Sequence, residues 1–183
     1  MEPLDHNSPV KTLGLLRHAK SEWDDLSTRD FDRGVNRRGR RGAALMGRHI
    51  ADSGAGWTKA IASPAERVKR TLDASGLDLD VTFNEKVYLA DAATLMAILQ
   101  DAPGDADALL LAGHNPGMQE LALELVADEE GELYDAVMQK YPTASYAVLE
   151  LDIEDWSDLR ARCGRIVHFA RPRDLDPELG PGR

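Results

Sequence analysis

Short apolar segments of three to eight residues recur along the chain, and polar or glycine-containing stretches separate them. Segments of this length and composition are typical of buried β-strands. The pattern predicts six strands, at residues 11–16, 59–62, 81–83, 108–112, 146–153 and 165–169.

Four segments between these strands have the features of helices, at residues 36–52, 63–75, 92–99 and 115–125. The sequence Ser63-Pro64-Ala65-Glu66 favours a helix start, because serine can cap, proline fits the first helical position and glutamate can complete a capping box. Gly76 is expected to end that helix. Asn115-Pro116 likewise resembles a cap followed by proline at the first helical position.

The alternation of strands and helices predicts an α/β fold with a mostly parallel sheet covered by helices on both faces. The length of 183 residues suits one core, so we expect a single domain over residues 11–170. Residues 1–10 and 171–183, rich in proline and charge, are expected to be an N-terminal and a C-terminal tail.

The composition narrows the class of protein. Cys163 is the only cysteine, which rules out an intrachain disulfide or a cysteine-based zinc site. No apolar run approaches the roughly 20 residues that a membrane-spanning helix needs. Residues 1–10 lack the apolar centre of a signal peptide, so we expect a cytoplasmic protein.

The charge is unevenly distributed along the chain. The net charge of −10 argues against a general binder of nucleic acid or of anionic membranes. Residues 1–70 nevertheless hold 14 Lys and Arg against 9 Asp and Glu, whereas residues 71–183 hold 8 against 23. This excess of cations suggests a local anion site, although a solvated, arginine-rich helix face would explain it equally.

Candidate catalytic residues follow three of the predicted strands. Arg17-His18 ends the first strand, Arg67 follows Ser63-Pro64 after the second, and His114 follows the strand at 108–112. Ligands of parallel sheets bind at the carboxyl ends of strands, so these side chains are candidates for one site. An Arg-His pair at a strand end is more often a surface feature, but the repetition favours a site.

These residue types suit phosphoryl transfer. A neutral His18 can attack phosphorus through one ring nitrogen while an acceptor holds the N–H of the other. Arg17 and Arg67 offer permanently charged, planar donors for the phosphoryl oxygens. His114, if protonated, would add a further donor, and this chemistry requires no metal.

At this point the sequence resembles a known family. The segment Leu15-Leu16-Arg17-His18-Ala19-Lys20-Ser21-Glu22-Trp23 is similar to the Arg-His-Gly/Ala signature of the histidine phosphatase superfamily. The remainder resembles the short SixA-type phosphohistidine phosphatases over about residues 12–175. The further matching motifs are Asp30-Phe31-Asp32-Arg33, Asn36-Arg37-Arg38-Gly39, Ser63-Pro64-Ala65-Glu66-Arg67, Gly113-His114-Asn115-Pro116-Gly117, Tyr141-Pro142-Thr143-Ala144 and Arg171-Pro172-Arg173-Asp174-Leu175.

The resemblance implies a phosphoglycerate-mutase-like, three-layer α/β/α sandwich and a phosphohistidine intermediate on His18. It also implies a phosphate pocket formed by Arg17, Arg67 and His114, with no metal or organic cofactor.

The sequence does not identify a general acid. Asn115 follows His114 at the position where the acid phosphatase branch has aspartate. Glu85, Asp91 and Asp24 are candidates for an acid or a substrate contact, and for Asp24 ordinary loop polarity explains the residue equally well. Lys20 could add positive charge near His18 or simply lie on the surface.

We therefore expect a metal-independent phosphatase that hydrolyses phosphohistidine or a related phosphoramidate or phosphomonoester. The expected partner is a phosphorylated protein or a small phosphorylated molecule, with no nucleic acid and no membrane. The alternatives are a non-catalytic phosphate-binding module and a general small-molecule phosphomonoesterase.

Overall fold

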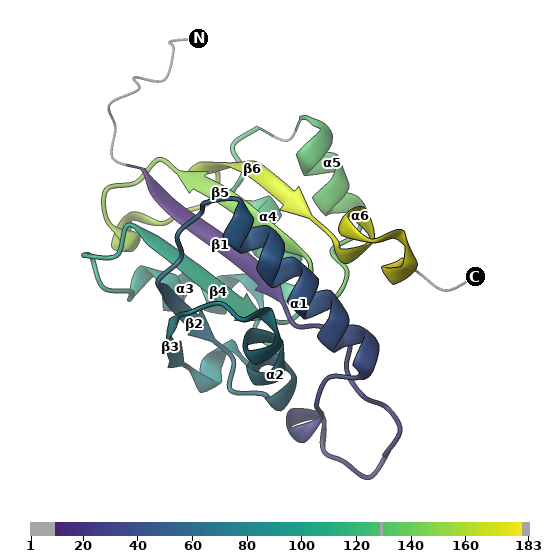
Figure 1. Ribbon diagram of the computed structural model, residues 1–183. Coiled ribbons are helices and arrows are strands. Elements are labelled where there is room, and N and C mark those ends of the chain that lie inside the picture. The colour runs from purple at the N-terminus through teal and green to yellow at the C-terminus, as the bar shows by residue number, and fades with distance from the viewer. Residues whose placement is uncertain (1–9, 129, 181–183) are drawn as a thin grey trace.

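A six-stranded sheet with the strand order β3-β2-β4-β1-β5-β6 forms the centre of the molecule (Figure 1). The computed structural model describes residues 10–128 and 130–180. Strands β1 to β4 are mutually parallel, whereas β5 is antiparallel to both β1 and β6. The strands are β1 (Lys11–Arg17), β2 (Lys59–Ala62), β3 (Asp80–Phe83), β4 (Ala108–Gly113), β5 (Tyr146–Leu151) and β6 (Gly164–Ala170).

Helices cover both faces of this sheet. Helices α1 and α2 lie on the face toward the viewer in Figure 1, and α3 and α4 lie behind it. The helices are α1 (Arg37–Asp52), α2 (Glu66–Ser75), α3 (Ala92–Gln100), α4 (Gly117–Leu125), α5 (Glu132–Gln139) and α6 (Pro172–Leu175). The three-layer α/β/α arrangement predicted from the sequence is therefore confirmed.

Side chains of the central strands are divided between two apolar clusters that form the two halves of the core. Leu13 and Leu15 of β1 pack in one cluster with apolar side chains of α3, α4 and α5. Leu16, two β4 residues and the inner faces of α1 and α2 form the other cluster. Because both faces of β1 and β4 are covered, these strands read as nearly continuous apolar runs.

The helix starts differ in how closely they follow the prediction. Asn36 caps α1, since its side-chain oxygen accepts a hydrogen bond from the amide of Gly39 at 2.8 Å. The expected capping box at Ser63 is wrong, because α2 begins at Glu66 and its N-cap, Ala65, makes no side-chain bond. Gly76 does end α2, in a left-handed conformation with φ of 69°.

The segment of residues 171–180 belongs to the predicted C-terminal tail. In the structure it packs against α1. It forms α6 and a short 3-10 helix, Pro177–Leu179. Arg41 on α1 pairs with Asp176 and Glu178, and Arg38 donates to the carbonyl of Gly180. Residues 1–9 and 181–183 of the two predicted tails lie outside the described residues.

Two further features complete the fold. Helix α5 was not predicted from the sequence; it packs against β6 and α4, and its Val137 is buried in the core. Within the part of the chain that the structure describes, no helix combines the length and apolarity needed to span a membrane.

Candidate active site

Two histidines meet where the adjacent parallel strands β1 and β4 end. Arg17 is in register with Gly113, so His18 and His114 occupy neighbouring positions just beyond the sheet. The amide of His18 donates to the carbonyl of Gly113 at 3.0 Å. The two imidazole centroids lie 5.3 Å apart, with an interplanar angle of 55°. The convergence that a shared phosphate site requires is therefore present.

The hydrogen bonding of His18 defines the role of each ring nitrogen. Nδ1 lies 2.7 Å from the carbonyl oxygen of Ala19. Because a carbonyl only accepts hydrogen bonds, Nδ1 carries the hydrogen and Nε2 keeps its lone pair. Burial, together with the charges of Arg17 and Arg67, lowers the pKa of His18 to about 4. The ring is therefore neutral at pH 7 and able to attack an electrophile through Nε2.

Close packing fixes the loop that holds His18. The amide of Ala19 donates to Thr71 Oγ1 on α2 at 2.8 Å, and the amide of Ala144 donates to the carbonyl of His18 at 3.0 Å. Helix α1 approaches the same loop at Gly39. A Cβ at Gly39 would lie 2.3 Å from the backbone oxygen of Lys20, so only glycine fits there without a shift.

Arg17 lies next to His18, at the end of β1. Its Nη1 donates to the carbonyl of Tyr141 at 2.8 Å, and Asn115 Nδ2 donates to the same carbonyl at 3.0 Å. Its Nε is buried and has no hydrogen-bond partner among the described residues. Burial lowers the pKa of the guanidinium, but arginine remains charged at neutral pH. The guanidinium therefore keeps donor capacity beside His18.

Arg67 in the first turn of α2 is held by Asp30. Its Nη1 donates to the backbone oxygen of Asp30 at 2.7 Å, and its Nη2 donates to Oδ2 of the same residue at 3.0 Å. The hydroxyl of Tyr88 also donates to Oδ2, and Arg33 Nη1 lies 3.1 Å from Oδ1. The hydrogen bond from Tyr88 and the guanidinium of Arg67 lower the pKa of the Asp30 carboxyl, so it is ionised at neutral pH.

His114 is buried beside His18 and is only 2% exposed. Its Nε2 shares a hydrogen bond of 2.8 Å with Ser63 Oγ, and its Nδ1 has no partner among the described residues. Burial, with the charge of Arg67, lowers the pKa of His114 to about 3. The protonated form considered from the sequence is thus not the resting form. Ser63 contacts this histidine instead of capping α2.

A cavity of about 520 Å³ opens at this end of the sheet, and Arg17, His18 and Arg67 line it. Its lining includes seven cationic side chains and, within the described part of the chain, one carboxylate, that of Asp30. His114 is not among the lining residues. The cationic lining residues are Arg17, Lys20, Arg33, Arg38, Arg67, Lys140 and Arg173.

The secondary candidates separate into two groups. Lys20 lines the cavity. Asp24 and Glu85 are exposed and do not line it. Asp91 is also outside the lining; its carboxylate caps α3 by accepting from the amide of Thr94 at 2.8 Å, and this bond lowers its pKa.

Asp30 was missed as a site residue. It belongs to the Asp30-Phe31-Asp32-Arg33 motif, which is the one signal in the sequence that could have drawn attention to it. Its contacts with Arg67 and Tyr88 span 37 and 58 positions of the chain. Among residues 10–128 and 130–180, no three His, Cys, Asp or Glu side chains are grouped so as to hold a metal ion.

Comparisons with known proteins show which family the chain resembles. Residues 13–94 match the family model described as the histidine phosphatase superfamily (branch 1). An uncharacterised protein of Mycobacterium tuberculosis, Rv1276c, is 30% identical over 168 residues, covering 86% of this chain and all of the relative.

Solved structures show the same architecture. A protein named SixA from Nakamurella multipartitia is 26% identical, with a TM-score of 0.80 over 89% of this chain and 96% of the other. A SixA protein from Agrobacterium tumefaciens is 27% identical, with a TM-score of 0.73 over 88% and 98% of the two chains. The protein is therefore an enzyme of the histidine phosphatase superfamily and belongs to its SixA-type branch.

Proposed function

We propose that this phosphatase acts on phosphohistidine, or on a closely related phosphoramidate or phosphomonoester, and that His18 carries the phosphoryl group between two chemical steps. The observation that carries the proposal is the bond from His18 Nδ1 to the carbonyl of Ala19. It leaves Nε2 as an unprotonated nucleophile on a cavity lined by cations. The solved SixA proteins from Nakamurella and Agrobacterium are provisionally named phosphohistidine phosphatases.

In the first step, the lone pair of His18 Nε2 forms a bond to phosphorus. The bond from phosphorus to the substrate nitrogen breaks with its electron pair on nitrogen, so a substrate ring that is protonated at its other nitrogen leaves as neutral imidazole. In the second step, water attacks the phosphorus on Nε2, which restores neutral His18 and releases inorganic phosphate. The sum of the steps is hydrolysis of the substrate by one water molecule.

Three side chains would hold the phosphoryl oxygens. Arg17 and Arg67 supply permanent positive charge, and the buried Nε of Arg17 is free to donate. Nδ1 of His114 is likewise buried and unpaired among the described residues. A phosphoryl dianion beside His114 would raise the low pKa of this histidine, so anion binding and its protonation would be coupled.

The lack of a poised acid favours a substrate with a good leaving group. Asp30 is the one carboxylate of the lining among the described residues, and its contacts keep it ionised. An alcohol phosphate needs a proton donor as the alkoxide leaves. With phosphohistidine the leaving group is an imidazole, and its departure requires much weaker acid catalysis. Phosphohistidine is therefore the substrate class that these residues fit best.

Release of phosphate from two substrates tests the proposal. A phosphohistidine-bearing carrier protein and an aryl phosphate are compared with wild type, His18→Ala and a matched control, His168→Ala, whose histidine lies away from the cavity on β6. We expect wild type and His168→Ala to release phosphate faster from the carrier and His18→Ala to be inactive. Equal activity of His18→Ala and wild type would contradict the proposal.

A further inference from the structure

Besides Arg17 at the reacting centre, four cations of the cavity lining have no acidic partner among the described residues. We call Lys20, Arg38, Lys140 and Arg173 the outer cations. No carboxylate of the described residues lies within ion-pair distance of any of them, although Arg33 and Arg67 in the same lining both pair with Asp30. Arg38 makes one hydrogen bond, to the carbonyl of Gly180.

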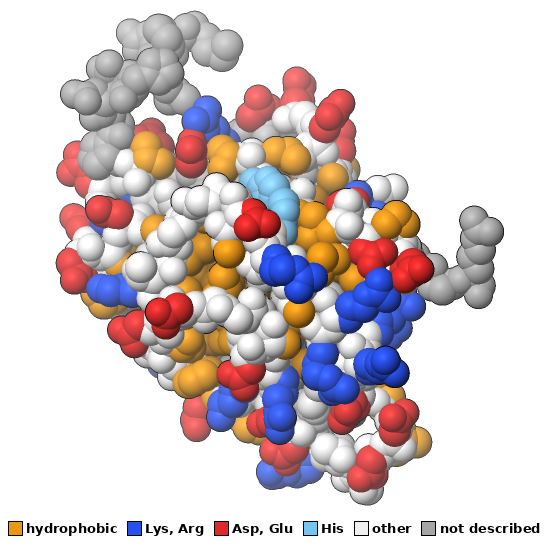
Figure 2. Space-filling view, in the orientation of Figure 1, with side chains coloured by type: hydrophobic (Ala, Val, Ile, Leu, Met, Phe, Trp, Pro, Cys, Tyr) orange, Lys and Arg blue, Asp and Glu red, His pale blue; other side chains and the backbone are white. Residues whose placement is uncertain are grey.

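This concentration of positive charge is unusual for so acidic a chain. The protein has 32 Asp and Glu against 22 Lys and Arg. The cavity lining nevertheless holds seven cations and, among the described residues, one carboxylate. Two of the outer cations, Lys140 and Arg173, come from residues 71–183, where acidic residues outnumber basic ones by 23 to 8. Figure 2 shows Lys and Arg side chains gathered over the N-terminal half of α1 and beside α6.

The backbone beneath two of these cations is well anchored. Lys140 precedes Tyr141, whose carbonyl accepts from Arg17 and whose hydroxyl donates to the carbonyl of Leu15 at 2.6 Å. Arg173 lies on α6, where Arg171 forms a two-pronged bond to Asp174, with both distances 2.9 Å. The fold therefore presents these charges at defined places on the cavity wall.

One phosphoryl group does not account for the outer cations. Arg17 and Arg67 already supply the charge that a phosphoryl group needs at His18. The cavity of about 520 Å³ falls in the range of sites for whole drug-sized ligands, so it has room for a group much larger than a phosphate. The outer cations thus face whatever part of the substrate extends beyond the reacting group.

We propose that the outer cations recognise acidic side chains that flank the phosphohistidine of a substrate protein. This inference rests on the proposed function and names its substrate class as a phosphoprotein with Asp or Glu beside the modified histidine. Trp23 supports a protein partner, because it lines the same cavity, is 60% exposed and stacks under Arg33 at 3.6 Å. Exposed aromatic and arginine side chains are typical anchors of protein interfaces.

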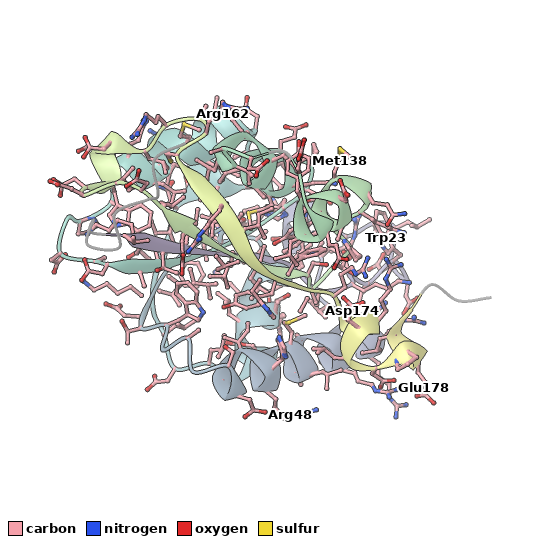
Figure 3. All side chains as sticks on the ribbon, turned by 90° about the horizontal axis from the view of Figure 1, so that it is seen from above. Trp23, Arg48, Met138, Arg162, Asp174 and Glu178 are labelled. Carbon is pink, nitrogen blue, oxygen red and sulfur yellow. The ribbon has the colours of Figure 1, made fainter. Side chains whose placement is uncertain are left out.

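The test compares three substrates with four proteins. The substrates are a phosphohistidine peptide flanked by glutamates, the same peptide flanked by glutamines, and phosphoimidazole, which is too small to reach the flanking positions. The proteins are wild type, Lys140→Ala, the double variant Lys140→Ala/Arg173→Ala and the control Arg48→Ala. Arg48 is an exposed cation on the outer face of α1, whereas Trp23 and Asp174 lie at the cavity end (Figure 3).

We expect wild type to prefer the glutamate peptide and the double variant to lose about fivefold to tenfold in kcat/KM on it, through KM. Hydrolysis of phosphoimidazole should be unchanged in all variants, and Arg48→Ala should match wild type. The preference should shrink as salt rises. Equal use of both peptides by wild type, or an equal loss on phosphoimidazole in the double variant, would overturn the inference.

Failure of the proposed function gives a different result. If wild type hydrolyses none of the three substrates, the proposed function fails. Fluorescence anisotropy of the labelled peptides then still tests whether the outer cations bind acidic flanking residues. Tighter binding of the glutamate peptide, weakened in the double variant and kept in Arg48→Ala, would support it, and equal binding of both peptides would overturn it. Thermal melting of each variant verifies that the fold is intact.

Discussion

Replacing His114 with glutamine should change how strongly acid destabilises the fold. Burial lowers the pKa of His114 to about 3 and that of His18 to about 4, whereas an unfolded histidine has a pKa of about 6.5. Below pH 6.5 the unfolded chain therefore binds protons that the folded chain does not bind. The fold therefore has its full stability from these two groups above pH 6.5, and this stability decreases as the pH falls below 6.5.

The size of this effect follows from the pKa difference. At pH 5.0 an unfolded histidine lies about 1.5 pH units below its pKa, and each unit is worth about 1.4 kcal/mol. Both folded-state pKa values lie well below 5, so each histidine contributes a loss of about 2 kcal/mol between pH 7.5 and pH 5.0. Wild type should lose about 4 kcal/mol from the pair, and His114→Gln about 2 kcal/mol.

Urea denaturation at pH 7.5 and pH 5.0, in buffers without phosphate, measures this difference. The titrating carboxylates are common to both proteins, so their contribution cancels when the two pH-dependent losses are compared. Ser63→Ala is the matched control, because it removes the hydroxyl that bonds His114 and keeps the histidine. The free energy of unfolding that Ser63→Ala loses between pH 7.5 and pH 5.0 should equal the loss of wild type. An equal loss in His114→Gln and wild type would refute the burial of a neutral histidine.

Three further substitutions test other parts of the account. Asp30→Asn removes the charge that holds Arg67, so kcat should fall about tenfold without a rise in KM; an unchanged kcat would contradict that positioning role. Gly39→Ala should destabilise the fold by about 1–3 kcal/mol in urea denaturation, because the added Cβ would collide with backbone atoms. At Gly42 an added Cβ would make only ordinary contacts, so the control Gly42→Ala should be neutral or stabilising. Equal stability of the two variants would show that the close approach is absent. Arg41→Ala should lower stability by less than about 1 kcal/mol, since its ion pairs are exposed, yet it should speed proteolysis of residues 171–180; unchanged cleavage would contradict the role of this arginine in holding the segment.

The strands and the central pair of histidines could be predicted because their signals are local. The runs at β1 and β4 are apolar since both faces are covered, and the residues after parallel strands meet at one edge of the sheet. The positions of Arg17 with His18, and of Gly113 with His114, are therefore enough to predict a shared site from the sequence alone.

The remaining features depend on contacts between distant parts of the chain. The segment of residues 171–180 is rich in proline and charge, but Arg41, more than 130 positions earlier, pairs with Asp176 and Glu178. Asp30 lies in a polar loop, and its role follows from contacts with residues 37 and 58 positions away. Local patterns carry no information about such pairs.

Ser63 shows how a strong local signal can be overruled. Its sequence context fits a helix cap, yet its hydroxyl bonds His114 on the neighbouring strand end, and α2 begins three residues later. The buried imidazole has a polar nitrogen to satisfy, which a rule for helix caps does not take into account.

The central claim is that His18 becomes phosphorylated during turnover. Wild type, His18→Ala and His168→Ala are mixed with a carrier protein bearing radiolabelled phosphohistidine and quenched within milliseconds in alkali, and the label is located by peptide mapping. The account predicts a label on His18 that is stable in alkali, labile in acid and chased by unlabelled substrate, present in wild type and His168→Ala and absent from His18→Ala. Release of phosphate by wild type with no label on His18 at any quench time, together with an active His18→Ala protein, would contradict it.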